Sequence, residues 1–419
     1  MSIGIGYCIP NRRGISWSSY WATRNPTLLN VTGMRDTEID FSWTDNSAGD
    51  CSFAIYRSTD GVNYSSVGTT VAGDTTYTAT GLTAGNLYYF RVVGVKSGNE
   101  SDPTNVYDTY FKITIDTTKA GSAADTFVLP VTAKAAGSYF VDWGEGGAEE
   151  EFTTTGDKTH TYGAAGTYQV KVRGSMTAMA FNNAGDKDKL MYVDNWGNLA
   201  WSSMYAAFYG CSNMTGNYTD APNLSAVTNM YAMFHGCSSF NQSVSNFNTA
   251  KVGSMAYMFR GCSSFNQGVS NFNIAAVTDI SFMFLGCNIN AAGTTTNYDA
   301  TLVAWAAQDA PNSLNFHGGT SKYGEGLVEN GTTDGAAANK LIQSGQNFLT
   351  TVAVGDVVYN TTDGTYALVT AIDSDTQLSI SADIMANAEV YRIQHSAAAK
   401  ARASLILNDL WTITDGGYL

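Results

Sequence analysis

The chain has little basic charge and no long apolar run. Its 22 Lys and Arg residues stand against 36 Asp and Glu residues, a difference of −14, and no basic cluster is interleaved with aromatic residues. Nucleic acid is therefore not an expected partner. No apolar stretch approaches the ~20 residues that cross a bilayer, so we expect no membrane insertion.

Short catalytic and metal-binding motifs are also missing. The sequence contains no HExxH, GxSxG, GxxxxGK[ST] or CxxC, and its four histidines lie far apart at His160, His235, His317 and His395. We therefore expect a protein that is not an enzyme, with no catalytic residue, no cofactor and no metal. A glycan-cleaving activity stays open as the alternative, because the carboxylates of a glycosidase can come from distant strands.

A tandem repeat is the most informative feature that is present. The segments MYAAFYGC, MYAMFHGC, MAYMFRGC and ISFMFLGC end at Cys211, Cys237, Cys262 and Cys287, which are 26, 25 and 25 residues apart. A fixed period of this length is typical of a solenoid, in which each coil buries its apolar face on the next. We expect the four cysteines to form a buried column of reduced thiols, and binding by the side of the stack is the first functional hypothesis.

Each period contains two patterns of local structure. SVSNFN and GVSNFN alternate apolar and polar residues, which predicts short parallel strands with Asn246 beside Asn271 and Asn248 beside Asn273. The Met-x-x-Met-Phe-x-Gly-Cys part has helix-like spacing and ends at a glycine.

The recurring MF-x-GCSSFNQ and SNFN segments carry a family resemblance. The repeat resembles the leucine-rich-like repeats of BspA-type surface proteins and the related DUF285 family of mycoplasmas and phages, over about residues 190–326 and 396–417. The resemblance implies surface display and adhesion, without a particular ligand.

Variable positions within the repeat indicate the candidate ligand surface. The position after the shared Phe reads Tyr209, His235, Arg260 and Leu285, which is typical of a solvent-facing column. The full candidate set is Tyr205, Tyr209, Tyr231, His235, Tyr257 and Arg260. The alternatives are a freely varying exposed column and, for some of the tyrosines, a place in the core.

Two β-rich modules precede the repeat. Residues 26–108 resemble a fibronectin type III domain, through Trp43 and the corner pattern formed by Leu82 and Tyr88, and the resemblance implies a spacer. Residues 109–178 resemble a PKD-type sandwich, through the Asp-Trp-Gly turn at Asp142 and the strand GTYQVKV. This turn and the stretch after it contain the acidic residues Asp142, Glu145, Glu149, Glu150 and Glu151. They could be calcium ligands, a hydrolytic carboxylate pair or an exposed acidic loop.

The region after the repeat predicts an insertion. SLNFHGGTSKY resembles the closing strand of the repeat family, but its usual continuation appears only at Ala397–Gly417. We therefore assign residues 179–326 to the solenoid, 327–395 to an inserted small β-barrel, with a curled sheet as the alternative, and 396–419 to the C-terminal cap.

The N-terminal 25 residues contain many apolar side chains but too few residues for a core of their own. We expect an anchoring arm, with Ile5, Tyr7, Trp17, Tyr20 and Trp21 as contact candidates, and packing on the next module as the alternative. The stretch has no basic start before an apolar core and no small-residue cleavage site, unlike a signal peptide. Extracellular-type modules without an export signal favour release by lysis, and the opening resembles structural proteins in phages of Bacteroidota.

Together these features predict a mainly β, multidomain fold of two β-sandwiches followed by a leucine-rich-repeat-like solenoid with a barrel inserted in its cap. The expected function is that of a phage virion surface protein, a tail fibre or receptor-binding protein, located on the virion. Expected partners are other virion proteins, through the arm, a host surface glycan or protein, and further copies of the chain. The alternatives are a capsid decoration or head fibre protein, and an adhesin on a bacterial cell surface.

Overall fold

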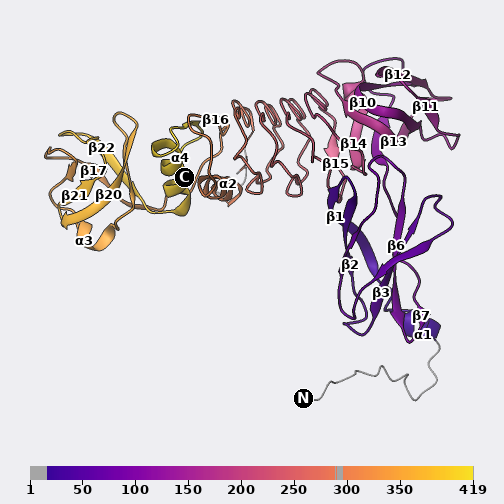
Figure 1. Ribbon diagram of the computed structural model, residues 1–419. Coiled ribbons are helices and arrows are strands. Elements are labelled where there is room, and N and C mark those ends of the chain that lie inside the picture. Colours follow the sequence, from indigo (N-terminus) through magenta and orange to yellow (C-terminus); the bar gives the residue numbers. More distant parts are fainter. Residues whose placement is uncertain (1–16, 288, 290–295, 419) are drawn as a thin grey trace, which may run out of the picture. The chain divides into compact units, whose positions relative to one another are not determined.

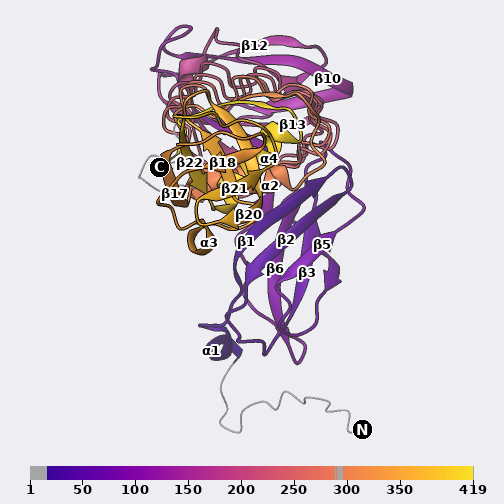
Figure 2. The same ribbon diagram turned by 90° about the vertical axis from the view of Figure 1, so that its left-hand side faces the viewer.

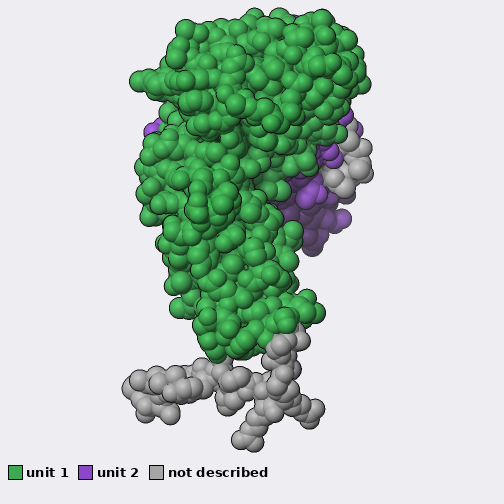
Figure 3. Space-filling view, turned by 90° about the vertical axis from the view of Figure 1, so that its right-hand side faces the viewer, with its two compact units in different colours: residues 1–180, 184–203, 214–226 green, residues 181–183, 204–213, 227–419 purple. Residues whose placement is uncertain are grey.

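The computed structural model describes residues 17–287, 289 and 296–418 of the 419-residue chain (Figure 1). The described chain is mainly β and forms several modules. They fall into two compact units, coloured separately in Figure 3 and described here one at a time. Unit 1 holds residues 1–180, 184–203 and 214–226, and unit 2 holds residues 181–183, 204–213 and 227–419.

The first module of unit 1 is a sandwich of two antiparallel sheets (Figure 2). One sheet has the order β1-β2-β5, and the other has the order β4-β3-β6-β7 with β8 also on β6. The elements are α1 (Trp17–Trp21), β1 (Thr27–Arg35), β2 (Glu38–Thr44), β3 (Ser52–Ser58), β4 (Ser65–Thr69), β5 (Thr76–Ala79), β6 (Tyr89–Lys96), β7 (Asn99–Glu100) and β8 (Tyr107–Asp108).

The alternating sequence pattern of this module places one face of each sheet in a common core. In β2 the residues Ile39, Phe41 and Trp43 are all buried, while their neighbours are more exposed. Tyr88 forms the expected corner, because its hydroxyl accepts the backbone N–H of Thr83 at 3.2 Å.

The second module of unit 1 is one curled sheet of seven strands. Its order is β11-β10-β13-β9-β14-β15, with β12 also on β10. The elements are β9 (Phe111–Asp116), β10 (Thr126–Asp142), β11 (Glu150–Phe152), β12 (Gly156–Thr161), β13 (Thr167–Met179), the 3-10 helix η1 (Lys187–Lys189), β14 (Leu190–Asn195) and β15 (Thr215–Gly216). We expected this module to end at residue 178, but β14 and β15 extend its sheet into the region assigned to the repeat.

Irregularities in β10 explain the curl. The register of its pairing with β13 shifts between Val131 and Tyr139, so the 17-residue strand bends there. Its first half pairs with β12 and its second half with β11. Both β11 and β12 therefore lie along the same side of one long bent strand, opposite β13.

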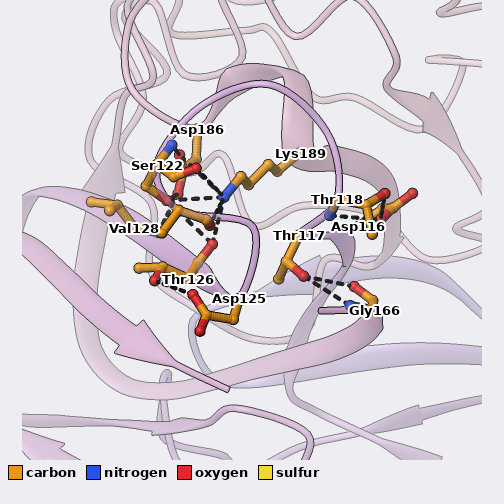
Figure 4. A network of polar contacts seen from close by, with 11 residues as sticks. Asp116, Thr117, Thr118, Ser122, Asp125, Thr126, Val128, Gly166, Asp186 and Lys189 are labelled. Atoms are coloured by element: carbon orange, nitrogen blue, oxygen red, sulfur yellow. Dashed lines mark hydrogen bonds and ion pairs between the residues drawn. The ribbon is translucent and has the colours of Figure 1, made fainter. Parts of the chain in front are cut away.

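A buried ion pair fixes the loop between β9 and β10 to the segment before β14 (Figure 4). The ammonium of Lys189 is fully buried and donates to the carbonyls of Ser122, Ala123 and Thr126 at 2.6–3.1 Å. The carboxylate of Asp186 accepts the N–H of Ser122 and of Val128 at 2.6 and 2.7 Å. Both buried charges are thus compensated by hydrogen bonds, as burial of charge requires.

In unit 2 the four repeat segments, residues 204–211, 230–237, 255–262 and 280–287, lie on one another in successive coils (Figure 1). In the first three, alternate N–H groups donate to the next coil, as Met230 donates to Ser254 and Phe234 to Met258, at 2.9 and 2.8 Å. The N–H groups between them bond within the coil, as Met233 does to Met230. This alternation leaves few buried backbone groups unpaired.

The local structure of the coils therefore differs from our expectation. The predicted strands SVSNFN and GVSNFN are turns and irregular chain, and the segment predicted as helical supplies the bonds between coils. Asn248 and Asn273 accept the N–H groups of Ala250 and Ala275 in their own coils instead of forming a ladder. Asn side chains favour such local bonds, which compete with strand pairing.

The thiols of the four repeat segments lie in a single row along the coils, as the repeat period predicts. Cys237, Cys262 and Cys287 each donate to a Phe carbonyl of the preceding coil, those of Phe208, Phe234 and Phe259, at 2.8–3.0 Å. The described cysteines form no disulfide. The rings of Phe208, Phe234, Phe259 and Phe284 stack beside them at 5.5–5.6 Å.

The chain before and after the inserted sheet meets at the end of the coils. β16 (Asn315–His317) pairs in parallel with β23 (Thr412–Thr414), and α2 (Thr296–Ala306) packs on α4 (Ala397–Leu407). Trp305, Phe316 and Trp411 form the core between them. The two ends of the intervening segment are adjacent, since the N–H of His395 donates to the carbonyl of Gly326 at 2.9 Å.

The intervening segment is a half-barrel sheet, which corresponds to the curled sheet among the expected forms. Its six strands have the order β17-β22-β19-β20-β21-β18, and an isolated antiparallel bridge joins Ile342 of β18 to Gly335, just after β17. Its elements are β17 (Leu327–Thr332), β18 (Lys340–Ile342), α3 (Phe348–Thr351), β19 (Val357–Asn360), β20 (Thr365–Ser374), β21 (Gln377–Ile380) and β22 (Val390–Gln394). Phe348 and Val352, in α3 and just after it, pack against the core of this sheet.

Candidate binding surface

A column of aromatic side chains runs along the coils of unit 2. It consists of Tyr205, Tyr231, Tyr257, Phe282 and His317, and we call it the aromatic column. Tyr205 and Tyr231 are stacked with their ring centroids 5.3 Å apart. The next three steps are 5.3, 5.1 and 6.2 Å. Each ring therefore lies over the next at about the spacing of the coils.

The backbone of the repeat segments determines where these side chains point. In every segment the third residue has a positive φ: Ala206, Ala232, Tyr257 and Phe282, at 48–60°. In the first two coils the aromatic residue precedes this position, whereas in the last two it occupies it. A non-glycine residue pays a conformational cost there, about 1–2 kcal/mol, which the stacking of coils must compensate.

A second column lies beside the first and ends in a cation. The rings of Tyr209 and His235 are stacked at 4.2 Å and nearly parallel. The guanidinium of Arg260 lies 5.3 Å from the ring centroid of Tyr257 and so joins the two columns. Burial, and then the charge of Arg260, lowers the pKa of His235, so this imidazole is neutral at pH 7.

The structure brings all six sequence-predicted ligand-surface residues together. Tyr205 is 47% exposed, and Tyr209, Tyr231, His235, Tyr257 and Arg260 are partly buried. The alternative that some of the tyrosines are core residues is therefore wrong. Comparison of the repeat segments within the sequence did not identify Phe282, which is 40% exposed, or His317 as members of this surface. The one-position shift of the aromatic residue after the second coil hid this continuity.

The stacking of the two columns determines which groups they expose to a ligand. Because most ring faces are covered by neighbouring rings, the columns present ring edges and hydroxyl groups. Such a surface offers apolar area and hydrogen-bonding groups at a regular spacing. It suits a flat, extended ligand more than a small molecule that needs an enclosing pocket.

The anchor candidates differ in accessibility. Ile5 and Tyr7 lie outside the described residues. Trp21 is only 5% exposed and packs on Gly94 of the sandwich, where an added Cβ would lie 2.9 Å from the indole. Tyr20 is partly buried and donates to Asp50 at 2.8 Å, and Trp17 is also partly buried. Trp21 therefore packs on the fibronectin-like sandwich, in agreement with the alternative interpretation of the arm.

The acidic residues of the second module are held by protein partners. Asp142 is paired with Lys171 at 2.9 Å and Glu149 with Arg173, and Glu149 also accepts the hydroxyl of Tyr110 at 2.6 Å. Glu145 accepts from the N–H of Gly163 at 3.1 Å, which lowers its pKa, and it lies 3.0 Å from the ring of His160. Each of these three carboxylates therefore has protein partners in the second module.

Two further features are absent from the part of the chain that the structure describes. No cluster of three His, Cys, Asp or Glu side chains suitable for a metal ion lies there. Within the same residues, no helix has the length and apolar character needed to traverse a bilayer.

Comparison with known proteins identifies two segments. Residues 202–320 match the family described as "Mycoplasma protein of unknown function, DUF285", and residues 24–108 match the fibronectin type III domain. No curated protein matches the chain.

Some solved structures are similar to about a fifth of this chain. A structure of titin domains is 20% identical and covers 20% of this chain, with a TM-score of 0.19, and the match spans 31% of that structure. An Fn3-like protein from Clostridium thermocellum is 27% identical over 21% of this chain and 91% of its own, with a TM-score of 0.19. This chain thus combines a fibronectin type III domain at residues 24–108 with a DUF285 segment at residues 202–320.

Proposed function

We propose that this protein is a non-enzymatic phage virion surface protein that attaches to the host surface through the coils of unit 2. In this proposal the coils are a leucine-rich-like solenoid of the BspA type, and the fibronectin-like and PKD-like modules of unit 1 are spacers. The N-terminal arm contacts other virion proteins. The ligand is a glycan or protein of the host surface.

The aromatic column is the observation that carries the proposal. Stacked, partly exposed aromatic rings continue through four coils and onto His317, although none of them is needed to fill the core. Exposed aromatic residues in one contiguous row mark interaction surfaces more often than isolated ones do. Tyrosine adds a hydroxyl to its apolar area, which favours contact with a polar partner.

Weak contacts are sufficient for such a role. Each chain offers a shallow surface and so a modest affinity, but many copies on one particle act together. The resemblance of the repeat to those of BspA-type surface proteins also supports a role in adhesion.

Binding to bacterial cells tests the role of the column. The labelled protein is added to a panel of intact bacterial cells, and the double variant Tyr231→Ala with Tyr257→Ala is compared with it. We expect the double variant to lose at least about tenfold in affinity, because it removes two adjacent rings from the middle of the aromatic column. It should still fold, since alanine is already accommodated at the equivalent positions Ala232 and Ala256. Leu349→Ala, which removes a 58% exposed apolar side chain elsewhere in unit 2, is the matched control. Equal binding by all three proteins would contradict the proposal.

Labelling of intact particles distinguishes the alternatives. Antibody against the coils, located by electron microscopy, is expected at phage tails. Label on capsids would favour a decoration or head fibre protein, and label on cells alone would favour a bacterial adhesin. Release of new reducing ends from host polysaccharide would contradict the non-enzymatic part of the proposal.

A further inference from the structure

A second candidate site lies in unit 2, away from the aromatic column, where the half-barrel meets the closing segments of the chain. A pocket of about 290 Å³ opens there between β19, β20, α4 and β23. Its lining includes four tyrosines and one ion pair: Tyr323, Tyr359, Tyr366, Tyr418, Arg402 and Asp415. A second pocket of about 340 Å³ adjoins it and shares Tyr418.

The charged groups of the first pocket neutralise each other. Arg402 donates through Nε to Asp415 at 2.9 Å and through Nη1 to the hydroxyl of Tyr366 at 2.7 Å. Asp415 also accepts the hydroxyl of Tyr298 at 2.8 Å and the N–H of Gly417 at 3.1 Å. Both side chains are less than a tenth exposed. This ion pair therefore forms a rigid wall and leaves no net charge for an ionic ligand.

The cation at the neighbouring pocket is paired in the same way. Arg392 is bonded to Glu325, and its guanidinium lies 4.3 Å from the ring centroid of Tyr418. An anionic ligand would have to break one of two ion pairs, and a cationic ligand would meet the two guanidinium groups. The local charges thus favour a neutral ligand.

Hydrogen-bonding groups are nevertheless available at the opening. Among the described residues the hydroxyls of Tyr359 and Tyr418 have no protein partner, and the side chain of Thr414 is exposed. β23 is an edge strand whose only neighbour is β16. Thr412 and Thr414 bond toward β16, so the peptide groups of Ile413 face the other way, as alternate residues of a strand do.

The remaining lining is aromatic. The rings of Tyr359 and Tyr366 are stacked at 4.6 Å, and the ring of Tyr418 stands at 73° to that of Tyr359. A ligand of this pocket therefore needs apolar C–H surface against the rings and hydroxyl groups against the edge strand. The volume equals that of about ten water molecules, which is enough for one sugar ring.

We propose that this pocket binds a neutral saccharide unit, packed against the rings of Tyr359 and Tyr418 and hydrogen-bonded to the edge of β23. The adjoining pocket across Tyr418 would receive the next unit of the chain. The site does not depend on the aromatic column or on a role in a virion. Strand addition by a peptide is disfavoured because β23 has only three residues.

Saturation-transfer NMR on the full chain tests the proposal with defined sugars. The probes are glucose, galactose, mannose, N-acetylglucosamine and rhamnose, together with their β-linked disaccharides where these exist. We expect at least one to receive saturation with a Kd of about 1 mM, and a disaccharide to bind more tightly than its monosaccharide. In the protein labelled with 13C-tyrosine, that sugar should shift the ring signals of Tyr359 and Tyr418.

Two variants and one control separate this site from the aromatic column. Tyr359→Ala and Tyr418→Ala should each weaken binding by roughly tenfold, whereas the column variant Tyr231→Ala should bind the sugar normally. Tyr418→Phe retains the ring and isolates the contribution of its hydroxyl. If none of the probes receives saturation, or if the sugar shifts no tyrosine signal at this pocket in the wild-type chain, the proposal is wrong. The wild-type measurement decides even if an alanine variant does not fold.

Discussion

At the residue scale, one buried carboxylate makes the stability of unit 1 depend on pH. Asp220 is fully buried, and it accepts the N–H groups of Trp196 and Gly197 at 2.8–2.9 Å and the hydroxyl of Tyr107 at 2.9 Å. Burial raises its pKa to about 6, although these three donors act in the opposite direction. The hydrogen bonds therefore recover only part of the cost of removing the charge from water.

The sign of the pH effect follows from this raised pKa. The folded protein holds the proton of Asp220 up to about pH 6, whereas the unfolded chain releases it near pH 4. This contribution to stability is fully present below pH 4 and is lost as the pH rises through 6, by about 3 kcal/mol in all. We expect Asp220→Asn to remove this component. Denaturant unfolding of both proteins at pH 4 and pH 7 measures it, and an equal pH dependence in both would contradict the prediction.

The thiol column makes a second prediction at this scale. Burial raises the pKa of Cys237 and of Cys262 far above the usual range of a thiol, and each thiol is bonded to a carbonyl. Since the thiolate is the reactive form, neither cysteine should be alkylated by iodoacetamide in the folded protein. Mass spectrometry of labelled peptides tests this, with Ser270→Cys at an exposed position as a reactive control. Labelling of Cys262 at the rate of the control would contradict a buried column.

At the scale of the element, the period of the repeat sets which backbone groups of adjacent coils bond to each other. Met204 donates to Asn229 and Met230 donates to Ser254, so the second bond repeats the first one coil later. Removal of residues 230–254 would leave Met204 opposite Asn229 and bring Ala206 opposite Ala256 in place of Tyr231, so the register between the coils would be kept.

We therefore expect the chain lacking residues 230–254 to fold. Its free energy of unfolding should fall by about 1–4 kcal/mol, which is the usual share of 25 residues. A deletion of residues 230–253 is the matched control, because it shifts the register by one residue and moves core side chains toward solvent. Circular dichroism melting compares them. If both deletions unfold, or both melt alike, the register argument fails.

The third position of each repeat segment also shows how the stacked coils constrain the backbone. The positive φ at the third residue of each segment accepts Ala, Tyr and Phe, none of which favours it. The inter-coil bonds made by this residue, such as that of Tyr257 to Ser281 at 2.9 Å, hold the conformation in place. The backbone of the stack, and not the preference of the residue, thus decides where the ring points.

At the scale of the whole molecule, unit 2 has an inserted module with adjacent ends. The carbonyl of Gly326 accepts the N–H of His395, and the carbonyl of Glu325 accepts that of Ser396 at 3.1 Å. β16 and β23, which flank the insertion, pair directly with each other. The closing segments therefore need no residue of the half-barrel to pair.

Replacement of residues 327–394 by two glycines should leave the coils and the cap folded. We expect a loss of about 3–5 kcal/mol, because the deletion removes Arg392, which pairs with the buried Glu325, together with the hydroxyl of Tyr366 that Arg402 donates to. Near-UV circular dichroism of the cap, which contains Trp305 and Trp411, measures the outcome, with an internal deletion of residues 315–317 as a destabilised control. Loss of the tryptophan signal in the first deletion would mean that the cap depends on the half-barrel.

The sequence by itself determined the features that repeat or that follow a local rule. The spacing of the cysteines predicted a file of thiols, the Leu82 and Tyr88 pattern predicted the corner bond, and the displaced closing segment indicated where an insertion begins and ends. These features depend on side-chain size and spacing along the chain, which a sequence displays directly.

Only the tertiary structure decided which part of each coil carries the bonds between coils, how far the second sheet of unit 1 extends, and whether the inserted segment is a barrel or a curled sheet. Each of these depends on whether a polar group bonds within its own segment or to a segment far along the chain. The side chain of Asn248 bonds within its own coil, whereas the backbone N–H of Met230 bonds to the next coil. The pocket at Arg402 and the buried charge of Asp220 have the same origin. Their partners come from segments up to about a hundred residues apart, and only folding brings those groups within hydrogen-bonding distance.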